Sequence, residues 1–214
     1  MSIAPGAKQP KQDRSRASLE RLMSASRELL RDGTFEQLTI VAISKRSGVS
    51  VGSIYARFQG KGDLFLAVMT NVLAEVDAEW AALISAVRSQ NLPLEKRVPT
   101  LVDTLAEHLK AHSSLLRPLM SRADDKQVAS CGKASSMKAA HSFQSLLLEC
   151  CADIRHPNPV HAVAACYSIT YAALARFLGL GSAIEASGEG DWEQLKKDLG
   201  TMCLGFLRIE MEQI

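Results

Sequence analysis

The stretch Leu38–Leu64, LTIVAISKRSGVSVGSIYARFQGKGDL, decides the fold of the N-terminal part of the chain. Two short helical patterns meet at Ser47-Gly48-Val49, where a glycine supplies the positive φ that a tight turn requires. The side chains outside the apolar positions are small, hydroxylated, aromatic or basic. The pattern predicts a helix-turn-helix whose second helix is narrow enough to enter a DNA groove. Its shared core is expected to contain Ile40, Ile43, Val49, Ile54 and Phe58.

Composition and charge favour a globular, soluble, helical protein. Hydrophobic residues make up 47% and charged residues 22% of the 214 residues, and aromatic residues are few. No run of alternating β-branched residues is bounded by turn signals, so the sequence predicts an all-α fold. Residues 1–62 carry 11 Lys and Arg against 5 Asp and Glu, whereas the remainder carries 14 against 18. This asymmetry predicts that only the N-terminal end meets a polyanion.

The cysteines and the hydropathy indicate a cytoplasmic protein. The five cysteines contain no CxxC pair and are odd in number, so a disulfide scaffold is not expected and a reducing compartment fits best. No signal peptide pattern opens the chain, and no apolar run approaches the roughly 18 residues of a membrane span. We therefore expect no membrane partner.

Hydrophobic periodicity and turn signals predict about nine helices. Residues 1–12, which mix Pro, Gly, Gln and Lys, are expected to form a disordered tail. The fourth predicted helix would reach roughly 40 Å, which is long enough to connect one domain with another. The helices are expected over residues 13–32, 40–47, 51–58, 61–89, 94–111, 114–122, 131–153, 159–180 and 191–213.

Ten residues at fixed spacing follow the order T-x-x-x-I-x-x-x-x-G-V-S-x-G-x-x-Y-x-x-F-x-x-K-x-x-L. They resemble the DNA-binding domain of tetracycline-repressor (TetR) family regulators. The resemblance covers about residues 15–75, with the helix-turn-helix motif at about 39–58. It implies a two-domain homodimeric repressor, with residues 76–214 as the effector-binding and dimerisation domain. The ten residues are Thr39, Ile43, Gly48, Val49, Ser50, Gly52, Tyr55, Phe58, Lys61 and Leu64.

The resemblance also implies roles for individual residues, because in that family the second and third helices dock in the major groove. By position, residues 51–53 would face base edges, while Thr39, Tyr55 and Lys61 would hold phosphates. Residues 51–56 contain no Asn, Gln or Arg, so apolar contacts, water and DNA shape are expected to share the specificity. The predicted DNA-binding residues are Thr39, Lys45, Arg46, Ser50, Val51, Gly52, Ser53, Tyr55, Arg57 and Lys61.

A small, largely apolar effector is expected to bind among the helices that follow the helix-turn-helix. His108 and His112 stand four residues apart, as metal ligation would need, but the sequence nominates no third ligand. We therefore favour pocket-lining or hydrogen-bonded histidines and predict neither a metal site nor a cofactor. The predicted pocket residues are Trp80, Leu83, Leu101, Leu105, His108, His112, Phe143, Leu147 and Tyr171.

The last two predicted helices carry wide apolar stripes, and we expect them to form a four-helix interface with a second copy of the chain. The alternative is that the stripes serve the intramolecular core alone. The predicted interface residues are Val163, Tyr167, Leu174, Leu178, Leu195, Leu199, Met202 and Phe206.

Two other functions remain open at this point. A DNA-binding regulator could sense redox state or a metal through cysteines or histidines, with Cys131, Cys150 and Cys151 as the thiol candidates. An all-α enzyme is the third possibility, but we find no Ser/His/Asp order, glycine-rich phosphate loop or carboxylate cluster to support one. The sequence therefore predicts a ligand-responsive transcriptional regulator.

Overall fold

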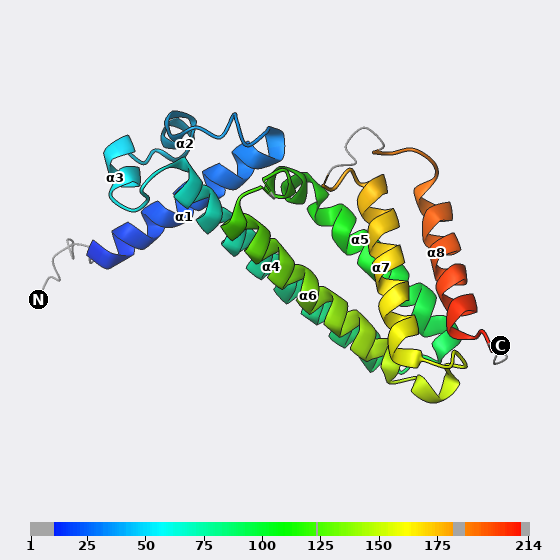
Figure 1. The fold of residues 1–214 in the computed structure, drawn as a ribbon. Coiled ribbons are helices and arrows are strands. Elements are labelled where there is room, and N and C mark those ends of the chain that lie inside the picture. The colour runs from blue at the N-terminus through cyan, green and yellow to red at the C-terminus, as the bar shows by residue number, and fades with distance from the viewer. Residues whose placement is uncertain (1–10, 123, 182–186, 211–214) are drawn as a thin grey trace, which may run out of the picture. The chain divides into compact units, whose positions relative to one another are not determined.

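The computed structural model describes residues 11–122, 124–181 and 187–210, and within them the chain is all α (Figure 1). The predicted fold class is therefore confirmed. None of the helices in these ranges is long and apolar enough to cross a membrane. A short 3-10 turn, η1, spans Cys151–Asp153. The eight α-helices of the described residues are α1 (Lys11–Asp32), α2 (Ile40–Ser47), α3 (Val51–Tyr55), α4 (Lys61–Ser89), α5 (Leu94–Met120), α6 (Lys126–Leu148), α7 (Pro159–Phe177) and α8 (Trp192–Leu207).

The helix count is lower than predicted because the helices expected over 94–111 and 114–122 are one continuous helix, α5. The intervening His-Ser-Ser was expected to break the helix. Instead, the Ser113 hydroxyl donates to the Lys110 carbonyl oxygen at 2.8 Å. A serine that bonds to the preceding turn satisfies its own hydroxyl inside a helix and does not end it.

The observed bounds of other helices also differ from the predicted ones. The start of α6 lies five residues before the predicted Cys131, because the Asp125 carboxylate caps the helix by accepting from two backbone N–H groups. The helix α3 ends at Tyr55, before the predicted Phe58. The helices α7 and α8 are shorter than expected, while α1 starts two residues earlier, at Lys11. The rest of the predicted tail, residues 1–10, lies outside the described residues.

The chain divides into two compact units, Met1–Val68 and Met69–Ile214, with the division inside α4. The N-terminal unit contains α1 to α3 and the first turns of α4. Its core is closed by an edge-to-face contact between Phe35 and Phe65, whose ring centroids are 4.7 Å apart. The fully buried side chains of this unit include Leu22, Leu30, Leu38, Ile43, Ile54 and Phe65.

In the C-terminal unit α5 packs along α8 and against α6 and α7, and α6 packs along α7 (Figure 1). The helix α8 approaches α5 closely at Gly200. A Cβ at this position would lie 3.3 Å from the Cα of Pro99, which is backbone and has little freedom to move. Gly200 therefore serves an intramolecular contact.

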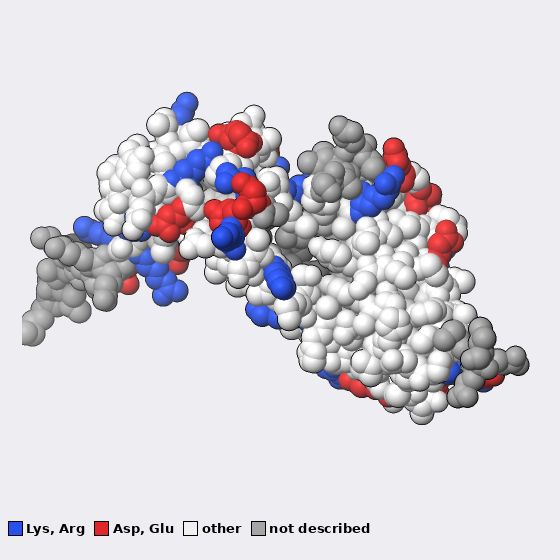
Figure 2. Space-filling model, in the orientation of Figure 1, with Lys and Arg blue, Asp and Glu red and all other residues white. Residues whose placement is uncertain are grey.

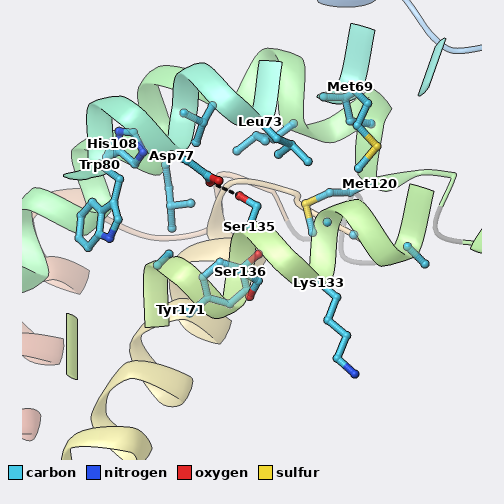
Figure 3. A pocket seen from close by; sticks show the side chains of 18 of the residues that line it. Met69, Leu73, Asp77, Trp80, His108, Met120, Lys133, Ser135, Ser136 and Tyr171 are labelled. Carbon is cyan, nitrogen blue, oxygen red and sulfur yellow. Dashed lines mark hydrogen bonds between the residues drawn. The ribbon is translucent and has the colours of Figure 1, made fainter. Parts of the chain in front are cut away.

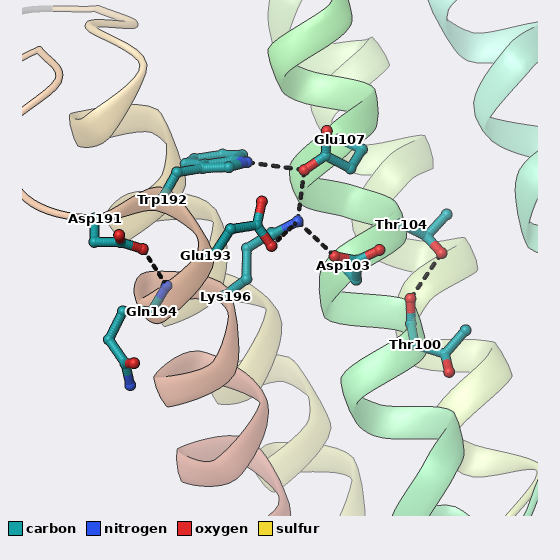
Figure 4. A network of polar contacts seen from close by, with 9 residues as sticks. All are labelled: Thr100, Asp103, Thr104, Glu107, Asp191, Trp192, Glu193, Gln194 and Lys196. Carbon is teal, nitrogen blue, oxygen red and sulfur yellow. Dashed lines mark hydrogen bonds and ion pairs between the residues drawn. The ribbon is translucent and has the colours of Figure 1, made fainter.

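A buried lysine joins α8 to α5 (Figure 4). Lys196 is 9% exposed, and its Nζ lies 2.7 Å from Asp103 Oδ1, 2.7 Å from Glu107 Oε1 and 3.1 Å from Glu193 Oε2. The indole N–H of Trp192 donates to the same Glu107 oxygen at 2.8 Å. Burial lowers the pKa of Lys196, but its three carboxylate partners more than offset this effect, so the pKa is raised.

We expect Lys196→Met to lower the free energy of unfolding by about 1–2 kcal/mol, which is less than for a fully buried pair because the carboxylates are half exposed. Urea unfolding at pH 7 measures the loss, and Lys197→Met, at an exposed position, is the matched control. The hydrogen bond from Lys196 lowers the pKa of Glu107, so this stabilisation is present above the ordinary glutamate pKa and is lost as the pH falls below it. Equal midpoints for the two variants would contradict the role of the lysine.

Candidate nucleic-acid interface and ligand cavity

The turn that joins α2 to α3 is held by several local hydrogen bonds. Thr39 caps α2, with its hydroxyl oxygen accepting from the Ala42 N–H at 3.1 Å. Gly48 ends α2 with φ 67°, in the left-handed region that favours glycine. Ser50 caps α3 by accepting from the Ser53 N–H at 3.2 Å. The two helices therefore have a fixed relation to each other, as in a helix-turn-helix.

The outer surface of α3 is small and exposed. Ile54 is buried in the core of the N-terminal unit, whereas Tyr55 is 55% exposed and Val51 is 39% exposed. A Cβ added at Gly52 would meet nothing within 4 Å. A glycine inside a helix costs about 1 kcal/mol relative to alanine, and no contact within the unit requires it here. An external surface that approaches the backbone closely would explain it.

Three of the predicted basic DNA contacts already have partners within the unit. Arg46 pairs with Glu28 at 2.8 Å, and Arg57 donates to the backbone carbonyl and the hydroxyl of Ser15. Lys61 Nζ lies 3.9 Å from the Phe35 ring centroid, and it donates to the Glu36 carbonyl oxygen at 3.4 Å. DNA would have to share these cations with their present partners. The other predicted DNA contacts are all exposed, namely Thr39, Lys45, Ser50, Val51, Gly52, Ser53 and Tyr55.

Charged side chains are unevenly spread over the visible surface (Figure 2). On the N-terminal unit, Lys and Arg side chains stand between smaller groups of Asp and Glu. The visible surface over α7 is almost without charge, which agrees with its sequence, since Arg176 is the one Lys, Arg, Asp or Glu in the helix. The visible surface over α7 therefore differs in chemistry from that of the N-terminal unit.

The C-terminal unit encloses a cavity of about 380 Å³ between α4, α5, α6 and α7 (Figure 3). Met69, Leu73 and Val76 of α4 form one wall. The side of α6 that faces it consists mainly of small residues, among them Ala129, Gly132 and Ala139, which leave the space open. Four of the nine predicted pocket residues line the cavity, namely Trp80, Leu105, His108 and Tyr171.

The other five predicted pocket residues do not line it. Leu101, Phe143 and Leu147 are at most 1% exposed and fill the packing between helices. Leu83 is 36% exposed, on the outside of α4. His112 lies beside the cavity and pairs with Glu79. Apolar periodicity places a residue on an inward face, but it does not distinguish a packed core from a cavity wall.

Two buried polar atoms of the cavity wall, His108 Nε2 and Tyr167 Oη, make no hydrogen bond of good geometry among the described residues, although the Ser136 side chain lies near the Tyr167 hydroxyl. Burial and the neighbouring His112 lower the pKa of His108, so it is neutral. Burial and the neighbouring Tyr171 raise the pKa of Tyr167 to about 12. The Asp77 carboxylate is paired with Ser135 and Lys138, and the Lys133 side chain points away from the cavity (Figure 3). The interior is therefore apolar, with two neutral polar groups.

Most of the predicted dimer residues lie in the interior of the C-terminal unit. Leu195 and Phe206 are half-buried, and Met202 is 45% exposed. On α7 the large apolar side chains that remain exposed are Val160 and Ile169. The wide stripes thus largely serve the intramolecular core, and the outward face of these helices carries different residues. The buried members of the predicted set are Val163, Tyr167, Leu174, Leu178 and Leu199.

All five cysteines are free. Cys150 is buried, and desolvation raises the pKa of its thiol, which makes it a poor redox sensor. Cys166 and Cys203 are also buried, between α7 and α8, where each Sγ bonds to the backbone carbonyl of the other residue. These three thiols act as small hydrophobic groups in the packing.

A three-helix core with an exposed, small-residue helix after a glycine turn defines a helix-turn-helix DNA-binding protein. The sequence family described as "Bacterial regulatory proteins, tetR family" matches residues 22–68. The N-terminal part of the chain is therefore a DNA-binding domain of the TetR type. TetR-family regulators bind DNA and are not enzymes, which argues against the enzyme alternative.

Solved structures share the fold over nearly the whole chain. A putative TetR-family transcriptional regulator from Mesorhizobium loti is 17% identical, with a TM-score of 0.67, over 94% of this chain and 98% of that chain. FadR from Bacillus subtilis, solved in complex with stearoyl-CoA, is 12% identical, with a TM-score of 0.65, over 89% of this chain and 100% of that chain. No curated protein sequence matches the chain.

Proposed function

We propose that this regulator is a homodimeric repressor that acts in the cytoplasm and leaves its operator when a small, largely apolar effector binds. The observation that carries the proposal is the cavity of about 380 Å³ in the C-terminal unit. Its volume is within the range of small-molecule sites, and its wall is apolar with a few polar groups, as such sites are. Because α4 belongs to both units, a ligand of the cavity has a direct route to the DNA-binding domain.

The docking mode follows from the exposed surface of α3. With Gly52 and Ser53 at its first turn, the backbone of α3 can lie close to base edges in the major groove. Tyr55 and Thr39 present hydroxyl groups to phosphates at either side. A dimer would read two half-sites about 34–36 Å apart on a roughly palindromic operator.

We expect Gly52→Ala to separate stability from DNA binding. The added methyl group meets no atom of the protein, so the free energy of unfolding rises by up to about 1 kcal/mol. The same methyl group stands between α3 and the bases, and we expect operator affinity to fall about tenfold or more. The probe is a duplex that the wild-type protein selects from a random-sequence library, and binding is measured by fluorescence anisotropy.

Ser85→Ala, at an exposed position of α4 in the C-terminal unit, is the control and should change neither quantity. A Gly52→Ala protein that is more stable and binds the duplex as tightly as wild type would refute the close approach of α3 to DNA.

The proposed dimer surface is the outward face of α7 and α8. On α7 this face carries Ser168, Ile169 and Ala172, all exposed, and on α8 it carries Met202. Small side chains permit two helices to approach closely, and the exposed face of α7, which is almost without charge, suits a second copy of itself. The inward face of both helices is already occupied by the core.

We expect Ile169→Glu to shift the chain from dimer to monomer, because the interface would have to bury an unpaired carboxylate. Sedimentation velocity at micromolar protein concentration gives the dimer fraction directly. Met137→Glu makes the same type of change at a 62% exposed position of α6, and it should leave the dimer intact. If both variants sediment like wild type, the interface lies elsewhere.

The effector class follows from the cavity wall. An apolar body would cover Met69, Leu73 and Val76, while one polar group of the ligand could bond to His108 Nε2 or Tyr167 Oη. The charged residues of the wall are already engaged or turned away, since Asp77 is paired with Ser135 and Lys138 and the Lys133 side chain points away from the cavity, so a charged group of the ligand would remain at the opening. FadR from Bacillus subtilis, which has the same fold, was solved with stearoyl-CoA, and an acyl chain is one candidate of this chemical class.

We expect Ala139→Phe to fill the cavity and to weaken the binding of the neutral apolar dye N-phenyl-1-naphthylamine about tenfold or more. The increase in dye fluorescence on titration with protein measures the affinity. Ala134→Phe, on the exposed side of the same helix, adds the same ring outside the cavity and should bind the dye like wild type. Equal weakening by both variants, or no binding to wild type, would contradict an open apolar cavity.

A further inference from the structure

Glu79, His108 and His112 form a cluster of three metal-type ligands at one wall of the cavity. Their donor atoms all lie within 4.8 Å of one another. His112 Nε2 is 2.7 Å from Glu79 Oε2, and the two imidazole centroids are 4.9 Å apart. The histidines are one helical turn apart on α5, and Glu79 comes from α4. Tertiary structure therefore supplies the third ligand that the sequence alone did not nominate.

His108 carries a buried ring nitrogen that can accept a ligand. The residue is 7% exposed, and its Nε2 has no hydrogen-bond partner among the described residues. An interaction with the backbone of Val76 also acts on this imidazole. Metal-binding histidines offer one ring nitrogen to the ion while a neighbouring group orients the ring through the other. A buried nitrogen without a partner is unfavourable, so a group that bonds to it would stabilise the site.

We propose that Glu79, His108 and His112 bind a divalent transition-metal ion such as Zn²⁺ at the edge of the cavity. Two histidines and one carboxylate form a common ligand set for such ions. Zinc holds nitrogen and oxygen donors at about 2.0–2.2 Å, so tetrahedral donors lie about 3.3–3.5 Å apart. The donor atoms of Glu79, His108 and His112 lie between 2.7 Å and 4.8 Å from one another. Shifts of about an ångström, of the size that side-chain rotation produces, would bring them to the zinc-binding distances.

The surroundings allow an ion to enter and to bind. The side chain of Glu79 is 59% exposed and that of His112 is 17% exposed, so both reach the surface and can rotate. His108, in contrast, is a wall residue of the cavity, next to Trp80 (Figure 3). Three protein ligands leave a fourth position open, as in metal sites that also bind a small molecule. Because His108 belongs to the cavity wall, a donor atom of an effector or water in the cavity would be placed to complete the coordination.

The alternative is a site without metal function, in which Glu79 and His112 form an ordinary surface hydrogen bond and His108 lines the cavity. Co²⁺ distinguishes the two. Reduced, metal-free full-length protein is titrated with Co²⁺, whose visible d–d absorption reports coordination by nitrogen and oxygen. We expect one ion per chain without the sulfur-to-metal charge-transfer band that cysteine ligands would give. Paramagnetic quenching of Trp80, whose ring lies 5.5 Å from His108, should follow the same titration.

Zn²⁺ competition against bound Co²⁺ gives the affinity of each variant. We expect Glu79→Gln and His108→Phe each to weaken binding by at least about 100-fold. His161→Ala, at an exposed position of α7, is the matched control and should bind like wild type. Glu79→Gln keeps the shape of an exposed side chain, so its folding, checked by circular dichroism, is not at risk.

Unchanged binding in both ligand variants, a thiolate charge-transfer band, or only millimolar affinity in wild type would overturn the metal site. The open position toward an effector rests on the proposed function, but the metal titration uses neither DNA nor effector. A failed titration thus leaves the repressor proposal standing. Normal metal binding by a protein that ignores its selected duplex would count against the repressor alone.

Discussion

The burial of α5 is the constraint on which the C-terminal unit depends. Asp103 and Glu107 lie on one side of this helix and hold Lys196 of α8, while Leu105 and His108 lie on another side and face the cavity. The side of α5 that faces α8 is closely packed, because a methyl group at Gly200 of α8 would contact the backbone of Pro99 in α5. A helix that is fixed this firmly on one side can border an unfilled space on the other, although an empty cavity by itself costs stability.

The N-terminal unit depends on smaller and more local contacts than the C-terminal unit. The helix α3 has only five residues. Its position is fixed by the buried side chain of Ile54, by the Ser50 cap and by the hydrogen bonds from Arg57 to Ser15. Exposed ion pairs such as Arg46 with Glu28 add little to the stability, because solvent screens them. Their greater effect is to restrain the cationic side chains, so that these side chains are already oriented when a polyanion approaches. The N-terminal unit thus loses some stability at Gly52, while the basic side chains of the unit are held in defined positions.

The sequence predicted the N-terminal unit well because its signals are local. The Gly48 turn, the Thr39 and Ser50 caps and the apolar spacing each act within one or two helical turns. The same kind of reasoning was wrong at His-Ser-Ser, where Ser113 bonds back into α5. Turn composition does not show whether a serine will find its partner inside the helix or outside it.

The cavity and the cluster beside it were less predictable because they depend on how helices meet. Leu101 and Leu105 share a stripe, yet one is core and the other is cavity wall. The informative signal was the small residues of α6, at positions 129, 132 and 139, because small side chains leave the space between helices unfilled. Glu79 reaches His112 from 33 residues away on another helix, and no sequence spacing indicates that contact.

The position of α4 explains how a ligand in one unit could act on the other. A ligand shifts an equilibrium only as far as its affinities for two arrangements differ. Met69 and Val76 of α4 line the cavity and Glu79 borders it, so both an apolar effector and a metal ion would favour particular positions of this helix. Leu64 and Phe65, at most 2% exposed, anchor the first turns of α4 in the DNA-binding domain. Because close-packed cores resist continuous deformation, a displaced α4 would carry that domain with it and would change the spacing of two recognition helices in a dimer.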